Sequence, residues 1–254
     1  MPIQLTKFDY LDLCYGYKWE ITDINKLAHL IAKIALGQHR HAKKIIEGSS
    51  SNIKYKPPLG NAIDLLTVPE NSDPWHRDGW LFQAISWIVA NKIYQDSLIL
   101  YPHMIHADKG FDGLHITIKD KKITEITIYE DKATKNPRKT IKDLVWPEFQ
   151  EFEQGSRDNV LLAEITPLLE GQRDLDIDEA IASIIWSDLR HYRVSITIGD
   201  THNKEAYHKN LFDGYEDITK EHIKRKAETI YIQDLRESMK DLADKVIEEI
   251  NKIV

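Results

Sequence analysis

The sequence contains a single cysteine, Cys14, among its 254 residues, and it has no hydrophobic run as long as a membrane span. One cysteine cannot form an intrachain disulfide or supply a thiolate zinc site, which excludes disulfide-stabilised secreted folds and cysteine-ligated zinc modules. The N-terminal stretch MPIQLTKFDY also lacks the apolar segment of a secretory signal. We therefore expect a cytoplasmic protein that does not enter a membrane.

An excess of positive charge is missing as well, because 41 acidic side chains outnumber 34 basic ones and give a formal net charge of −7. Proteins that coat nucleic acids are usually basic overall, so this balance argues against that class. It is compatible with a nuclease, which needs only a local basic track beside an acidic metal site. The hydrophobic fraction of 42% is ordinary for a globular protein with a large core.

Apolar periodicity predicts an α/β (α+β) fold that occupies residues 1–254 as a single domain. The segment PENSDPW at 69–75 separates an N-terminal α/β extension, residues 1–72, from a core at about 73–254. Helices are predicted at 24–46 (with Gly37 as a point of interruption), 75–94, 139–154, 159–170, 177–189 and 234–254. Strands are predicted within 1–20 and 110–132, and at 97–101, 192–198 and 229–232.

The stretch 110–132, GFDGLHITIKDKKITEITIYEDK, has the pattern of two strands joined by a tight polar turn. In both strands the buried isoleucines occupy even-numbered positions, as Ile116 and Ile128 illustrate. The two apolar faces oppose each other only if the numbers of paired residues add up to an even total. A three-residue turn at 120–122 gives a total of 242. This register places the carboxylates of Asp112 and Glu130 side by side.

Asp112, Glu130 and Lys132 are in phase with the buried faces of the two strands, where charge is costly unless it is paired or bound to a metal. Adjacent carboxylates repel each other, and a divalent cation is an ordinary way to hold them together. The pattern therefore predicts a Mg²⁺ or Mn²⁺ site on Asp112 and Glu130. In the alternative interpretation, Asp112 caps a turn after Gly110, and Glu130 forms an ion pair with Lys132 at the rim of the sheet.

Basic residues follow the predicted site closely, within eleven residues that begin at Lys132. The candidates for nucleic-acid binding are Lys135, Arg138, Lys139 and Lys142. The alternative is an ordinary solvated helix face, since isolated charge runs seldom identify a partner. His115 is out of phase with Asp112, so we expect it at the surface or on the second face of the sheet.

The motif Gly-Phe-Asp112, then seventeen residues, then Glu130-Asp131-Lys132, with helices before and after, resembles the PD-(D/E)XK nuclease superfamily. The resemblance covers about residues 75–155 and implies a restriction-endonuclease-like αβββα core with a mixed central sheet flanked by helices. It implies that Asp112, Glu130 and Lys132 are catalytic, that the two carboxylates and the Asp131 carbonyl hold Mg²⁺, and that Lys132 orients the attacking water. The expected activity is Mg²⁺-dependent hydrolysis of DNA.

The helix predicted at 75–94 departs from this pattern. Some members of the superfamily carry an additional acid on that helix, whereas HRDGWLFQAIS contains no glutamate. Asp78 and Gln83 are the residues that could substitute, and Asp108 is a candidate for an outer ligand. The missing acid puts a second metal ion in doubt. It favours the alternative of a catalytically degenerate subunit that binds nucleic acid or protein within a larger complex.

Within the superfamily, the chain looks most similar to the HamA family of effector nucleases of Hachiman antiphage defence systems. The segments that carry this likeness are KGFDGLHI, IYEDKAT and AETIYIQDL, the last of which precedes an amphipathic helix. The likeness implies a helicase partner subunit that restrains the nuclease until foreign or damaged DNA is sensed. Cleavage of RNA, or nicking of one strand, would use the same residues.

Overall fold

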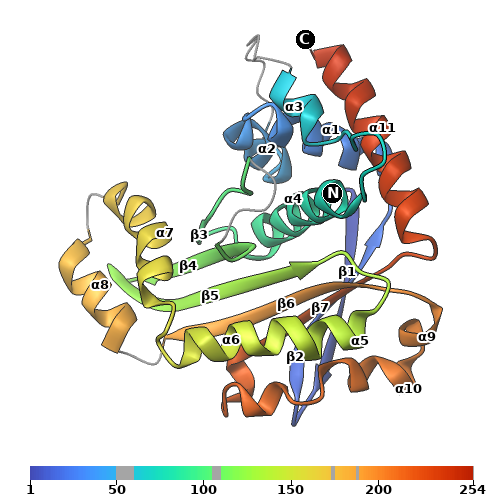
Figure 1. Cartoon of the computed structure of the whole chain (residues 1–254). Coiled ribbons are helices and arrows are strands. Elements are labelled where there is room, and N and C mark those ends of the chain that lie inside the picture. The colour runs from blue at the N-terminus through green and yellow to red at the C-terminus, as the bar shows by residue number, and fades with distance from the viewer. Residues whose placement is uncertain (50–59, 105–109, 173–174, 187–188, 254) are drawn as a thin grey trace.

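A seven-stranded mixed sheet, flanked by helices on both faces, forms the centre of the computed structural model (Figure 1). The structure describes residues 1–49, 60–104, 110–172, 175–186 and 189–253. The strands are β1 (Ile3–Tyr10), β2 (Cys14–Ile21), β3 (Leu98–Ile99), β4 (Gly113–Lys119), β5 (Lys122–Lys132), β6 (Arg190–Ile198) and β7 (Arg225–Tyr231). Their order is β1-β2-β7-β6-β5-β4-β3, with β2, β7, β6 and β5 parallel and the pairs at both edges antiparallel.

Two hydrophobic cores lie on the two faces of the sheet. One is covered by α1 (Ile24–Ala35), α2 (His39–Ile46), α3 (Gly60–Asp64), α4 (Trp75–Ile93) and α11 (Leu235–Ile253). The other is covered by α5 (Pro137–Thr140), a π-helical turn (Ile141–Val145), α6 (Trp146–Glu153), α7 (Asp158–Glu170) and α8 (Ile177–Trp186). The short helices α9 (Asp200–Asn203) and α10 (Glu205–His208) lie between β6 and β7 in the chain. In the described residues, every helix is too short or too polar to span a membrane.

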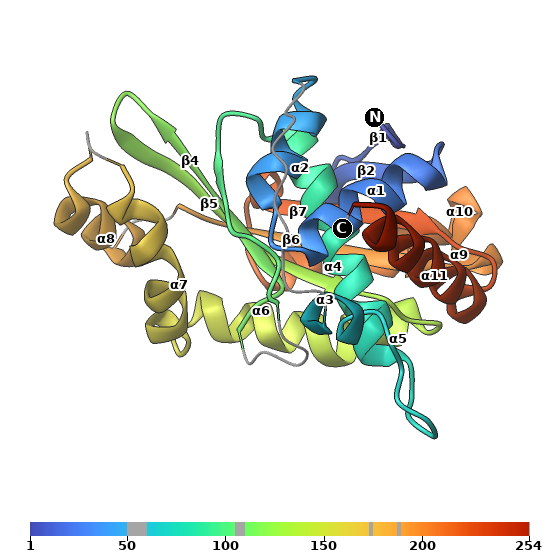
Figure 2. The same ribbon diagram turned by 90° about the horizontal axis from the view of Figure 1, so that it is seen from above.

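The alternating directions of the side chains in β5 explain how this strand contributes to both hydrophobic cores. Ile126 and Ile128 pack with Phe149 of α6, whereas Tyr129 packs with the cluster that contains α4. Side chains on a strand point alternately to opposite faces, so a strand with helices on both sides needs apolar groups at odd and even positions. The view from above (Figure 2) shows α7 and α8 beside the far end of the β4–β5 hairpin.

The helix, three strands and helix predicted between residues 75 and 154 occur in that order, as α4, β3, β4, β5 and the helical segment from α5 to α6. The helical segment predicted at 24–46 is divided in two at Gly37, the point of interruption that the sequence indicated. Gly37 adopts a positive φ of 71° and ends α1, and a second helix starts at His39. A left-handed glycine is the common end of a helix because it has no side chain to clash.

The turn between β4 and β5 also differs from the prediction. It contains two residues, Asp120 and Lys121, rather than three, because Lys119 pairs with Lys122. Both turn residues have positive φ, 50° and 63°, a conformation that suits the twist of a two-residue hairpin. A β-bulge next to Thr117 then places one extra residue in β5.

The bulge restores the register that the sequence predicts near the site. On the side of the bulge away from the turn, the numbers of paired residues add up to 242, and Leu114 lies opposite Ile128. Between the bulge and the turn, the partner of Ile118 is Ile123 and not the predicted Thr124. The register was therefore correct up to Gly113 and Tyr129, the last pair of the ladder and the chain neighbours of Asp112 and Glu130, although the predicted turn was wrong.

Two strands of the predicted N-terminal extension, β1 and β2, join the same sheet as the core. β1 pairs with β2, and β2 pairs in parallel with β7, where Tyr15 lies opposite Lys226. The β2–β7 contact is close at Gly16, because a side chain at this position would collide with the main-chain carbonyl of Ala227. α1 packs against the C-terminal helix α11, so the two ends of the chain share one hydrophobic core.

Candidate active site

The three predicted catalytic residues lie together at the C-terminal end of β5. Asp112 lies immediately before β4, and its main-chain N–H donates to the carbonyl of Tyr129, 3.2 Å away. Lys132 Nζ lies 2.7 Å from Asp112 Oδ2 and 2.5 Å from Glu130 Oε2. The lysine therefore bridges both carboxylates, and the pairing that the register predicted brings the three charges into contact.

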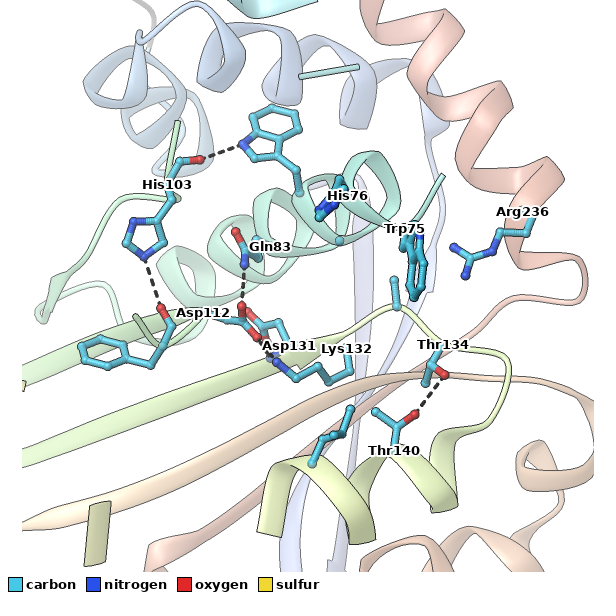
Figure 3. A pocket seen from close by; sticks show the side chains of 15 residues that line it. Trp75, His76, Gln83, His103, Asp112, Asp131, Lys132, Thr134, Thr140 and Arg236 are labelled. Carbon is cyan, nitrogen blue, oxygen red and sulfur yellow. Dashed lines mark hydrogen bonds and ion pairs between the residues drawn. The ribbon is translucent and has the colours of Figure 1, made fainter. Parts of the chain in front are cut away.

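Two hydrogen bonds fix the Asp112 carboxylate in addition to Lys132. Oδ2 accepts from the main-chain N–H of Asp131 at 2.9 Å, and Oδ1 accepts from Gln83 Nε2 at 2.6 Å (Figure 3). Burial alone would raise the pKa of Asp112, but Lys132 and these hydrogen bonds hold it below its usual value. Gln83 of α4 thus belongs to the site, whereas the alternative Asp78 is buried in ion pairs with Arg77 and Arg236.

The buried negative charge of Glu130 is the least stabilised charge of the site. Its side chain is 1% exposed, and in the described part of the chain neither oxygen receives a hydrogen bond of acceptable geometry. Burial raises the pKa of Glu130 well above its usual value, Lys132 opposes this shift, and Asp112 adds to it. A buried carboxylate with unsatisfied oxygens is energetically costly in the isolated protein. The same oxygens are what a hard divalent cation requires.

The donor set suits Mg²⁺ or Mn²⁺. Two carboxylates converge on the ammonium of Lys132, and the main-chain carbonyl of Asp131 lies next to Glu130 in the chain. The structure has no cluster of three or more acid, histidine or cysteine side chains placed for a metal within the residues it describes. Mg²⁺ commonly binds one or two carboxylates and takes its other ligands from water and phosphate, so these residues fit such an ion.

Asp131 points to the other face of the sheet, as its phase predicts. Its Oδ1 lies 3.3 Å from Nη2 of Arg193, a fully buried arginine of β6 that also bonds to Ser86 of α4. The guanidinium carbon of Arg193 stands 3.4 Å from the centre of the Tyr129 ring. Glu228 of β7 is buried in the same region and interacts electrostatically with Arg193. A layer of buried charge thus lies directly behind the C-terminal end of β5, on the face opposite Glu130.

Glu228 gives this layer a measurable pH dependence. Burial raises its pKa to about 7, against the effect of Arg193 and above the unfolded value of 4.5. The unfolded chain therefore loses this proton first, so stability falls as the pH rises from about 4.5 to about 7. We expect Glu228→Gln to gain roughly 1–3 kcal/mol over the parent at pH 8 but little at pH 4.5. Urea unfolding at both pH values measures this, and parallel pH profiles would contradict it.

His115 lies on the second face and is fully buried, so the alternative surface position is wrong. Its Nδ1 lies 2.5 Å from the Tyr129 hydroxyl, and its Nε2 lies 3.0 Å from Glu125 Oε1. Burial lowers the pKa of His115 to about 4, although Glu125 opposes the shift. The imidazole is consequently neutral at pH 7 and belongs to the buried polar layer, not to the site of Asp112.

A cavity of about 360 Å³ opens beside Asp112 and Lys132 (Figure 3). Its walls come from the start of α4, the end of β5, the segment after α5 and the start of α11. Its lining includes the side chains of Trp75, Gln83, Leu144 and Arg236. Solvent and a ligand can therefore reach the exposed parts of Asp112 and Lys132, whereas Glu130 lies beneath them.

The four predicted nucleic-acid-binding residues do not act as one group. Arg138 donates to the main-chain carbonyls of Leu211 and Asp213, so it stabilises the fold. Lys139 pairs with Asp143 on an exposed helix face. Lys135 and Lys142 are exposed, and Lys135 lies next to the C-terminal ends of β5, β6 and β7.

The sequence did not indicate Trp75, Leu144 or Arg236 as residues of the site. Their place in the cavity depends on the packing of α4, the π-helical turn and α11, which no local pattern encodes. Asp108, a candidate outer ligand, lies outside the described residues. Compared with protein-family models, with curated proteins and with solved structures, the chain has no match.

Proposed function

We propose that this protein is a metal-dependent nuclease that hydrolyses phosphodiester bonds in DNA. The observation that carries the proposal is the buried Glu130 carboxylate, which shares the Lys132 ammonium with Asp112 and, apart from that ion pair, receives no hydrogen bond from the described residues. One lysine neutralises only one of the two carboxylates, so the second buried acid leaves a negative charge that a bound metal ion would offset. The order helix, three strands, helix around the site supports a restriction-endonuclease-like core.

Each residue of the site has a distinct chemical part in this proposal. Asp112 and Glu130, with the carbonyl of Asp131, would hold Mg²⁺ or Mn²⁺, which lowers the pKa of a bound water and offsets charge on the phosphate. Gln83 and the N–H of Asp131 orient Asp112. Glu130 and Asp112 raise the pKa of Lys132 well above its usual value against the effect of burial, so Lys132 acts as a cation toward phosphate oxygens.

Cleavage of plasmid and linear DNA by the purified protein tests the proposal. We expect cleavage with Mg²⁺ or Mn²⁺ and none with EDTA. Lys132→Ala should abolish cleavage, because the phosphate oxygens then lose the cation that this side chain supplies. Cleavage that persists with EDTA, or in Lys132→Ala, would refute the assignment.

A catalytically degenerate binding module is the second candidate, and Gln83 is the observation that favours it. An amide donates to Asp112 at the position on α4 where a further acid could have bound metal. Such a subunit would retain the fold and its contacts with nucleic acid or protein without turnover. Absence of metal binding would distinguish it from the nuclease.

The biological setting is a separate proposal, supported by the segments KGFDGLHI, IYEDKAT and AETIYIQDL. We infer an effector of antiphage defence that acts with a helicase subunit, and DNA contacts supplied by that partner would suit a net charge of −7. The adjacent gene tests this inference. A helicase gene there would support it, and a DNA methyltransferase gene would favour restriction instead.

The exposed lysines after β5 provide a test of DNA contact. We expect the double change Lys135→Ala and Lys142→Ala to weaken binding of any DNA sequence. The slope of log K against the logarithm of the salt concentration should become shallower by about 0.7–0.9 for each phosphate contact that is lost. Lys119→Ala, at the far end of β4, is the matched exposed control. Anisotropy titrations at several salt concentrations measure the slope. An unchanged slope in the double variant would place the DNA track elsewhere.

A further inference from the structure

Trp75 is unusual among the tryptophans whose side chains the structure describes. It is 63% exposed, whereas Trp19, Trp80, Trp87 and Trp146 are each at most 6% exposed. Trp75 is the first residue of α4, and it lines the cavity that contains Asp112 and Lys132. A large aromatic surface left in water on the wall of a cavity that also contains charged groups indicates that a flat apolar group covers it in the bound state.

Leu144 provides a second apolar surface on the same cavity. It belongs to the π-helical turn Ile141–Val145 and is 58% exposed. The cavity thus combines exposed apolar side chains from two different elements with the charges of Asp112 and Lys132. A ligand that fits must carry both a planar apolar part and an anionic part, which is the chemistry of a nucleotide.

Arg236 adds a fixed cation to the cavity (Figure 3). It comes from α11, and its Nη1 pairs with Oδ2 of Asp78, a fully buried acid in the first turn of α4 that also pairs with Arg77. The Arg236 side chain remains 34% exposed. An arginine that is held through one nitrogen keeps other N–H groups for phosphate oxygens.

In the interior of duplex DNA the faces of each base are covered by its neighbours, so away from a duplex end Trp75 could stack only on a base that has left the helix or was never in one. On the basis of the proposed nuclease activity, we propose that the site takes single-stranded DNA, with the base of the nucleotide beside the scissile phosphate stacked on Trp75 and Arg236 on a neighbouring phosphate. The cavity volume of about 360 Å³ is within the range of small-ligand sites and suits one nucleotide rather than a helix.

DNA binding measured without metal ions tests this inference independently of catalysis. Fluorescence-anisotropy titrations of the full chain in EDTA would use a labelled oligothymidine and a labelled duplex of matched length. We expect the parent to bind the single strand more tightly than the duplex. Trp75→Ala should raise the Kd for the single strand about 5- to 150-fold, and Trp75→Phe should raise it much less, because base–aromatic stacking contributes about 1–3 kcal/mol per base.

Tyr207→Ala is the matched control, because Tyr207 is a 51% exposed aromatic residue on α10 that does not line the cavity. The inference is overturned if the parent prefers duplex, or if Trp75→Ala leaves single-strand binding unchanged or weakens both substrates equally. Thermal unfolding of each variant confirms that the fold is intact. Single-strand binding that depends on Trp75 without any metal-dependent cleavage would refute the nuclease and leave the stacking site standing.

Discussion

Replacing Glu130 with glutamine should abolish metal-dependent cleavage while leaving the protein folded and at least as stable as the parent. Glutamine keeps the shape of the side chain but removes a 1% exposed charge whose ion pair is with Lys132, and Lys132 keeps Asp112 as a partner in the variant. Loss of a metal ligand removes several kcal/mol of transition-state stabilisation, which corresponds to a decrease of at least about 100-fold in cleavage rate. Single-turnover cleavage with Mg²⁺ and urea unfolding measure the two effects.

The matched control is Glu153→Gln at the end of α6, where the carboxylate accepts from the Tyr192 hydroxyl and does not face Lys132. This variant should cleave at the rate of the parent. If Glu130→Gln cleaves at a similar rate to the parent, Glu130 is not a metal ligand. If it unfolds much more readily without losing cleavage, the Glu130–Lys132 pair is the structural rim ion pair of the alternative interpretation.

Removal of Arg193 should have the largest effect on stability. Arg193→Ala would leave Asp131 and Glu228, which are 5% and 1% exposed, without their buried cation. It also removes the guanidinium that stacks on Tyr129. Breaking one side of a buried ion pair typically costs about 3–5 kcal/mol, and we expect a loss of that size. Chemical denaturation monitored by tryptophan fluorescence measures it.

A pair of further variants identifies the cause of that loss. Arg193→Met combined with Glu228→Gln replaces two charges by uncharged side chains of similar size, so it should recover part of the stability. Lys240→Ala breaks an exposed pair with Asp244 and should leave the unfolding midpoint within error. A loss below about 1 kcal/mol in Arg193→Ala would show that the buried layer does not depend on its arginine.

The geometry of the site could be predicted because it depends on local rules. Alternation in β4 and β5 determined which residues share a face, and the even register placed Asp112 with Glu130. The turn was mispredicted because Asp120 and Lys121, neither of them glycine, adopt positive φ. The β-bulge offset this error, because burial of the isoleucines constrains the register more strongly than the turn does.

The buried polar layer behind the site could not be predicted. In β6 and β7, charged residues such as Arg193 and Glu228 alternate with apolar ones, which resembles a strand with one face in water. The structure instead covers this charged face with α4 and pairs its charges with one another. The strands predicted at 192–198 and 229–232 therefore begin later than β6 and β7, because the prediction left out the charged residues with which these strands start. The cavity residues Trp75 and Arg236 likewise depend on how distant helices pack.

Calorimetric titration of the protein with Mn²⁺ tests the central proposal most directly, because it requires neither the right DNA substrate nor a partner. We expect the parent to bind Mn²⁺, and we expect Asp112→Asn and Glu130→Gln each to weaken binding by at least about tenfold. Binding that is absent in the parent, or unchanged in both variants, would contradict a metal site at Asp112 and Glu130 and favour the degenerate binding module.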